Sequence, residues 1–305
     1  METALIVFRQ TVVMFLYMFA GYVLFRSGKI TIKGSKDIAS LLVYLVIPTV
    51  IVNSFCVERS GAKVAELVQS TAIAAAGIVI AMIISAAIFK KDPIANFGGA
   101  FSNAGFIGIP LVQAAFGDQA VFWIVGTVAL INMLQWSYGV RVITGEKSAT
   151  GLRHLLVNPI LVSIAIGLFL FLTNIGVHLP EVCKTALAGV SSLNAPLAMI
   201  VLGSYMAQAD LKKTVTTLHL YWLSAVRLIL IPVVTLIIYR FIPVRTDMLL
   251  AVYITMGTPI GANMAVYAQL YDRDYPYACQ AVVLTTLLSI VTLPVMLMAA
   301  DMLIH

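Results

Sequence analysis

The feature that most constrains this chain is a succession of apolar stretches, each about 20 residues long, which is the length of helix that crosses a bilayer. Ten such stretches fall at 5–25, 36–57, 64–89, 94–117, 119–143, 154–174, 181–205, 216–240, 248–270 and 276–300. Hydrophobic residues make up 61% of the chain and charged residues 10%, whereas a soluble domain is about half apolar and about a quarter charged. We therefore expect an all-α membrane protein with ten transmembrane helices.

Basic residues in the loops predict the orientation in the membrane. Of the 19 Lys and Arg residues, twelve lie in odd-numbered loops, five lie in even-numbered loops, and Arg9 and Arg227 lie inside apolar stretches. Because cytoplasmic loops are enriched in Lys and Arg, we expect a multi-pass protein of the cell membrane with both termini outside the cytoplasm. The net charge of +6 is therefore attributed to basic residues that set the orientation in the membrane, and no nucleic-acid partner is expected.

Prolines recur at a nearly constant distance along the chain. Pro48 and Pro196 are 148 residues apart, and Gly-Ile-Pro at 108–110 and Gly-Thr-Pro at 257–259 are 149 apart. This spacing indicates a duplication: residues 1–143 form the first five-helix repeat, 144–153 a short cytoplasmic linker, and 154–305 the second repeat. Since each unit has an odd number of spans, the second enters the membrane from the opposite side, and such inverted repeats are the plan of many secondary transporters.

The fourth and ninth stretches each contain a signal for a broken helix. Pro110 and Pro259 lack an N–H, so the carbonyl four residues earlier loses its helical partner. Such breaks persist in a membrane only inside protein or beside a water-filled cavity. We expect the two helices to unwind at these prolines and cross, with free N–H groups at 111–113 and 260–262 available to an anion. The alternative is that each proline only kinks its helix.

Polar side chains within the apolar stretches are the candidates for binding. Asn103 and Asn263 lie near the two prolines, and a buried amide needs a partner, either a ligand or another helix. Arg227 lies in mid-stretch with no central carboxylate in any stretch, so it faces a cavity, caps free carbonyls or meets an anion. Asn132 and Gln135 share one face of the fifth stretch and either line a cavity or pack against a helix.

An intramembrane enzyme is not expected. Such an enzyme needs a carboxylate pair, a metal cluster or an activated nucleophile, whereas the four histidines are dispersed and the three cysteines lack metal-ligand spacing. We therefore expect no metal and no cofactor. A sodium site usually includes a carboxylate, so proton coupling or uniport is favoured over sodium coupling.

The segment SNAGFIGIPL (102–111) resembles the N-x-G-F-x-G-x-P-L signature of the auxin efflux carrier family, which includes the plant PIN proteins and bacterial relatives. Five further segments resemble this family in order along the chain: VYLVIPTVIVNSF (43–55), NPILVSIAIGLFL (158–170), NAPLAMIVLGSYMA (194–207), RLILIP (227–232) and TPIGANMAVYAQLYDRDYPYACQAVVLTTLLSIVTLP (258–294). The resemblance thus extends over essentially the whole sequence.

The resemblance implies two inverted five-helix repeats, with helices 4 and 9 crossing at their prolines. It also implies separate scaffold and transport domains, as in an elevator transporter, often in a homodimer. A substrate carboxylate would lie at the crossing near Asn103. We expect alternating-access transport of a small organic anion, either a mono- or dicarboxylate such as malonate or malate, or an auxin-like carboxylate. A sodium-coupled organic-anion symporter or a passive channel is the alternative.

The expected site residues form two groups. Expected to bind substrate are Asn103, Gly105, Gly108, Pro110, Leu111, Pro259, Ile260, Asn263 and Pro48. Expected to act as either substrate contacts or structural residues are Arg227, Asn132 and Gln135.

Overall fold

The computed structural model describes residues 2–145 and 158–304, which are helical apart from turns and one isolated backbone bridge. Most of the expected linker (144–153) and the start of the sixth apolar stretch (154–157) lie outside the described residues. Seven described helical segments are long and apolar enough to cross a membrane: Leu5–Arg26, Ile32–Ser54, Gly61–Ile88, Asp118–Thr144, Glu181–Gln208, Leu218–Tyr239 and Tyr275–Ile304. Three shorter apolar helices are Ala104–Phe116, Pro159–Leu172 and Thr246–Gly257.

The helices of the first half come in the order α1 (Glu2–Arg26), α2 (Ile32–Leu41), α3 (Ile47–Ser54), α4 (Gly61–Ile88), α5 (Pro93–Ala100), α6 (Ile109–Phe116), α7 (Val121–Leu134) and α8 (Val140–Thr144). Those of the second half are α10 (Pro159–Leu172), α11 (Glu181–Ser191), α12 (Asn194–Gln208), α13 (Leu211–Thr216), α14 (Leu218–Ala225), α15 (Ile231–Tyr239), α16 (Thr246–Gly257), α17 (Asn263–Leu270) and α18 (Tyr275–Ile304). Three π-helical turns join helices end to end, namely Leu42–Val46 (α2 to α3), Gln135–Gly139 (α7 to α8) and Val226–Leu230 (α14 to α15), and a fourth, Ala104–Gly108, leads into α6.

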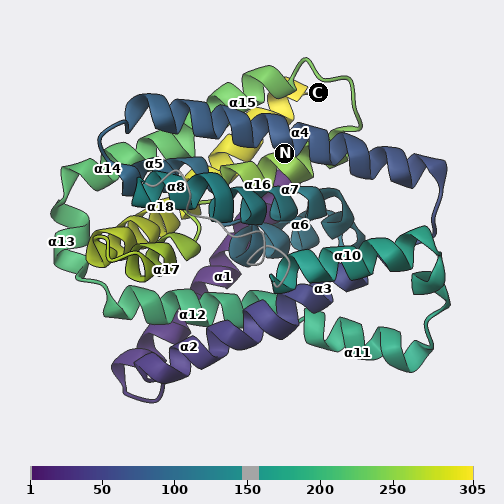
Figure 1. The fold of residues 1–305 in the computed structure, drawn as a ribbon, viewed down its shortest axis with the longest axis horizontal. Coiled ribbons are helices and arrows are strands. Elements are labelled where there is room, and N and C mark those ends of the chain that lie inside the picture. The colour runs from purple at the N-terminus through teal and green to yellow at the C-terminus, as the bar shows by residue number, and fades with distance from the viewer. Residues whose placement is uncertain (1, 146–157, 305) are drawn as a thin grey trace.

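The broken helices lie between longer ones. In the view of Figure 1, α4 runs along the upper side and α2 and α12 along the lower side, with α5, α6, α7 and α16 between them. Helix α1 packs closely against α12. A Cβ atom added at Gly203 would lie 1.9 Å from the Met18 carbonyl oxygen, so glycine is required for this approach of two backbones.

Three prolines follow directly after a π-helical turn. Pro48, Pro110 and Pro232 are each the second residue of an α-helix that continues from such a turn. Before Pro110, the Ile109 N–H donates to the Ala104 carbonyl five residues back. The wider turn gives room for the proline ring, which in an α-helix clashes with the carbonyl four residues earlier. Pro110 therefore does not interrupt the helix Ala104–Phe116, contrary to the sequence-based expectation.

The interruptions lie at residues 101–103 and 258–262. The expectation of free N–H groups at 111–113 is wrong, because these residues lie inside a continuous helix rather than at its start. The expectation for 260–262 is also wrong in part. The Ile260 N–H lies 3.4 Å from Thr285 Oγ1, and the Gly261 N–H donates to the Phe101 carbonyl over 3.2 Å. Proline thus marks the interruption in the ninth stretch but not in the fourth.

Candidate functional site

The two interruptions are paired with each other through their backbones. Ser102 and Ile260 form an antiparallel bridge. The Asn103 N–H donates to the Pro259 carbonyl over 2.8 Å, and Gly261 donates to Phe101 from the other side. Each non-helical segment thus satisfies backbone groups of the other, which removes much of the cost of breaking a helix inside a membrane.

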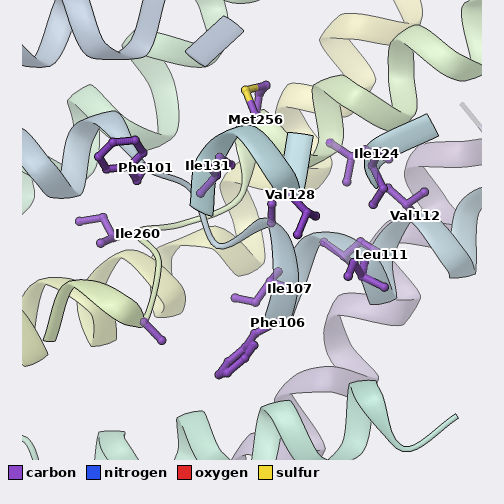
Figure 2. Close-up of a cluster of buried hydrophobic side chains, with 14 of the residues drawn as sticks. Phe101, Phe106, Ile107, Leu111, Val112, Ile124, Val128, Ile131, Met256 and Ile260 are labelled. Carbon is purple, nitrogen blue, oxygen red and sulfur yellow. The ribbon is translucent and has the colours of Figure 1, made fainter. Parts of the chain in front are cut away.

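The paired segments 101–103 and 258–262 are here called the junction, and apolar packing stabilises it. Figure 2 shows side chains from both interruptions (Phe101, Ile260) close to a cluster from the helix Ala104–Phe116, α7 and α16. Leu111 has no solvent exposure and lies in this packing. Gly108 lies against α16, where an added Cβ would be 3.0 Å from Thr255 Cγ2. Leu111 and Gly108 are therefore packing residues of the junction.

Arg227 is buried behind the junction, with 1% of its surface exposed. Its Nη1 donates to the Gly99 carbonyl over 3.1 Å, its Nε to the Thr258 carbonyl over 3.1 Å, and its Nη2 to the carbonyls of Met256 and Thr258. These oxygens lie at the C-terminal ends of α5 and α16, where carbonyls lack helical partners and the helix dipole is negative. The guanidinium group thus caps both helices that end at the junction.

A cavity of about 350 Å³, here called the central cavity, lies beside the junction. It is lined by Val43, Tyr44, Ile47, Ser102, Asn103, Ala104, Gly105, Phe106, Val128, Ile131, Asn132, Gln135, Trp136, Asn158, Pro159, Ile160, Gly261, Ala262, Asn263, Val266, Tyr267 and Leu270. None of these residues is charged. A ligand in the cavity would be held by neutral polar groups and apolar contacts.

Unpaired hydrogen-bond donors lie at the wall that Ser102 and Asn103 form. Asn103 is 5% exposed, and its Oδ1 accepts the Phe106 N–H over 3.3 Å, which caps the helix Ala104–Phe116. Among the described residues, the Asn103 Nδ2 and the Ser102 Oγ have no hydrogen-bond partner. The helix begins at this wall, where Ala104 and Gly105 also line the cavity. A helix N-terminus with unpaired donors beside it is a favourable place for an anion.

Three other amide side chains of the cavity take part in hydrogen bonds. The Asn263 Nδ2 donates to the Gln135 Oε1 over 3.1 Å, which connects α17 with the π-helical turn after α7. The Asn132 Nδ2 donates to the Val128 carbonyl over 2.8 Å. Ser102 and Asn103 differ from these amides, because their Oγ and Nδ2 atoms are buried and, among the described residues, lack a hydrogen-bond partner.

The structure separates the expected site residues into two sets. Asn103, Gly105, Asn132, Gln135 and Asn263 line the central cavity. The remaining residues do not line it. Pro48 lies in α3, and the others belong to the junction, its packing or its caps: Gly108, Pro110, Leu111, Arg227, Pro259 and Ile260.

An aromatic wall of the cavity was not expected from the sequence. Trp136 and Tyr267 both line it, and their ring centroids lie 5.0 Å apart in an edge-to-face contact. Tryptophan in a membrane protein commonly lies at the membrane surface, so Trp136 alone does not indicate a cavity. Its place directly after Gln135 was a signal that could have identified it.

The helices define a polytopic α-helical membrane protein, and two of its helices are interrupted where they meet beside the central cavity. A family described as "Membrane transport protein" matches residues 6–151 and again residues 148–297. The chain therefore belongs to this family, that of the auxin efflux carriers, and is a membrane transporter. No curated protein matches the chain significantly.

Proposed function

We propose that the protein is a secondary transporter that moves a small organic anion by alternating access and holds it in the central cavity. The observation that carries the proposal is the donor-rich wall at Ser102 and Asn103, beside the N-terminus of the helix Ala104–Phe116. A carboxylate is an acceptor with a negative charge, and it would satisfy these donors. Malonate, malate and auxin-like carboxylates are the first substrates to test.

Arg227 supports coupling to protons, or uniport, over coupling to sodium. In many secondary transporters the carbonyls at the ends of broken helices coordinate the coupling cation. Here the carbonyls of Gly99, Met256 and Thr258 already accept from a guanidinium group. A sodium ion would have to compete with this fixed cation.

The proposed architecture has ten spans in two inverted five-helix repeats. The fourth span consists of α5 with the helix Ala104–Phe116, and the ninth consists of α16 with α17. The match of the same family to each half of the chain in turn supports a duplication. The proposal includes crossing of these two spans, elevator-type movement, a homodimer, and both termini outside the cytoplasm.

Transport by the purified protein in liposomes tests the proposal. Uptake of radiolabelled malonate, malate and indole-3-acetate is measured under imposed pH, sodium and voltage gradients. We expect saturable uptake and exchange between internal and external substrate. Currents that do not saturate, without exchange, would indicate a channel, and a strict sodium requirement would indicate a sodium symporter. Absence of uptake of any organic anion would refute the proposal.

Asn103→Asp tests the site itself. An aspartate keeps the oxygen that caps Phe106 but replaces the amide donor with a negative charge. We expect at least a tenfold loss of affinity for a transported carboxylate, since one good hydrogen bond to a charged group is worth about 1.5–3 kcal/mol. Asn174→Asp is the matched control, because the Asn174 Oδ1 accepts the Arg59 N–H away from the cavity. Equal affinities in both variants would remove Asn103 from the site.

A further inference from the structure

A second cavity of about 380 Å³ adjoins the central one. It lies among α2, α12, α17 and α18, and its lining comprises Ile32, Lys36, Ala39, Ser40, Val43, Tyr44, Tyr205, Gln208, Ala265, Val266, Gln269, Tyr275 and Cys279. Val43, Tyr44 and Val266 line both cavities. The two spaces are thus separated by shared side chains.

The second cavity differs from the central one in charge. Lys36 is the one charged residue of its lining, and no ion pair involves it among the described residues. Lys36 is exposed, and a single unpaired cation at the wall of a cavity attracts anions and raises their local concentration. The lining of the central cavity has no charged residue, so Lys36 is the one charged residue in the combined lining of the two cavities.

The side chains between the cavities are suited to move. Val43 and Tyr44 belong to the π-helical turn Leu42–Val46, and Val266 lies on α17. Tyr44 is 71% exposed, so little packing holds its ring in place. An exposed side chain changes rotamer within nanoseconds, whereas a backbone segment moves more slowly. Tyr44 can therefore open or close the way between the two spaces without unfolding either helix.

We propose that the second cavity is an antechamber through which organic anions reach the central cavity, with Lys36 attracting them and Tyr44 forming the partition. This inference rests on the proposed function and adds the route to it. The antechamber fits an anion with an apolar body, because Ala39, Val43 and Ala265 line it together with the amides Gln208 and Gln269.

Cys279 reports on this space, since it lines the antechamber and is 9% exposed. In a Cys56→Ser, Cys183→Ser variant it is the single thiol. The variant in nanodiscs is labelled with the anionic sulfonatoethyl and the cationic trimethylammonioethyl methanethiosulfonate, each rate being normalised to that with free 2-mercaptoethanol. We expect the anionic reagent to react faster. Lys36→Gln should lower the anion-to-cation ratio about threefold to tenfold, and the control Lys29→Gln should leave it nearly unchanged.

Three results would overturn the antechamber: no preference for the anionic reagent, equal effects of Lys36→Gln and Lys29→Gln, or no labelling of the native protein when the denatured protein reacts. The measurement needs no transported substrate. Its failure is therefore distinguishable from a failure of the transport proposal, which liposome uptake tests separately.

A second measurement tests the partition. In a Cys56→Ser, Cys183→Ser, Cys279→Ser background, Ala262→Cys places a thiol in the wall of the central cavity. We expect Tyr44→Trp to slow its labelling by the anionic reagent and Tyr44→Ala to accelerate it. Equal labelling rates in the three proteins would show that Tyr44 does not control the passage.

Discussion

Replacement of Arg227 by methionine should destabilise the protein, because three buried carbonyls would lose their donor. Those of Gly99, Met256 and Thr258 accept from the guanidinium group at the ends of α5 and α16. A buried acceptor left without a partner costs about 1–3 kcal/mol, so the three together cost about 3–9 kcal/mol. Removal of a buried charge returns several kcal/mol of desolvation free energy. We expect a net loss of about 2–5 kcal/mol.

Thermal unfolding in detergent, followed by tryptophan fluorescence, measures this loss. A net loss of that size corresponds to a fall in Tm of about 5–15 °C. The Tm of Arg227→Lys should lie between those of Arg227→Met and wild type, because lysine keeps the charge but not the planar fork of donors. Arg240→Met is the matched control, since Arg240 is exposed, and its Tm should not change. An Arg227→Met protein that unfolds within 2 °C of the control would refute the capping role.

Two further variants test the packing and the start of the broken fourth span. Gly203→Val should reduce the yield of monodisperse protein in size-exclusion chromatography, since its Cβ would meet the Met18 carbonyl oxygen at 1.9 Å; Gly189→Val, where no atom lies within 4 Å, should have little effect. Asp92→Ala should lower the free energy of unfolding by about 1–2 kcal/mol, because Asp92 caps α5 through the Ala95 N–H and contacts His219. Asp92→Asn, which can keep the cap, should lose less, and equal losses would contradict this assignment.

Hydropathy predicts the long helices well, because their signal is local. The stretch 64–89 corresponds to α4 (Gly61–Ile88), and 276–300 corresponds to α18 (Tyr275–Ile304). The interruption in the fourth stretch could not be located in this way. A proline in the sequence indicates a missing N–H donor and hence a broken helix, but the π-helical turn before Pro110 lets the helix continue without that donor. The actual interruption at 101–103 contains no proline and is set by its pairing with residues 259–261, a contact between distant parts of the chain.

The cavity residues were predictable where they are amide side chains within an apolar stretch. Asn103, Asn132, Gln135 and Asn263 attract attention in an apolar sequence because a buried amide requires a partner. Tyr267 gave a weaker signal, since aromatic residues serve in many positions of a membrane protein. That Tyr267 lies one helical turn after Asn263 becomes informative only when α17 is known to begin at Asn263.

The distribution of hydrogen-bonded groups around the junction supports the proposal of an anionic rather than a cationic substrate. The helix ends contribute carbonyl acceptors, and Arg227 pairs with those of α5 and α16. Within the lining of the central cavity, the buried side-chain atoms left without partners are the Ser102 Oγ and the Asn103 Nδ2, both of which can donate. A cation there would find its carbonyl ligands already engaged, whereas a carboxylate would find donors and a helix N-terminus. Arg227 on one side of the junction and the donors of Ser102 and Asn103 on the other thus both favour a negatively charged ligand.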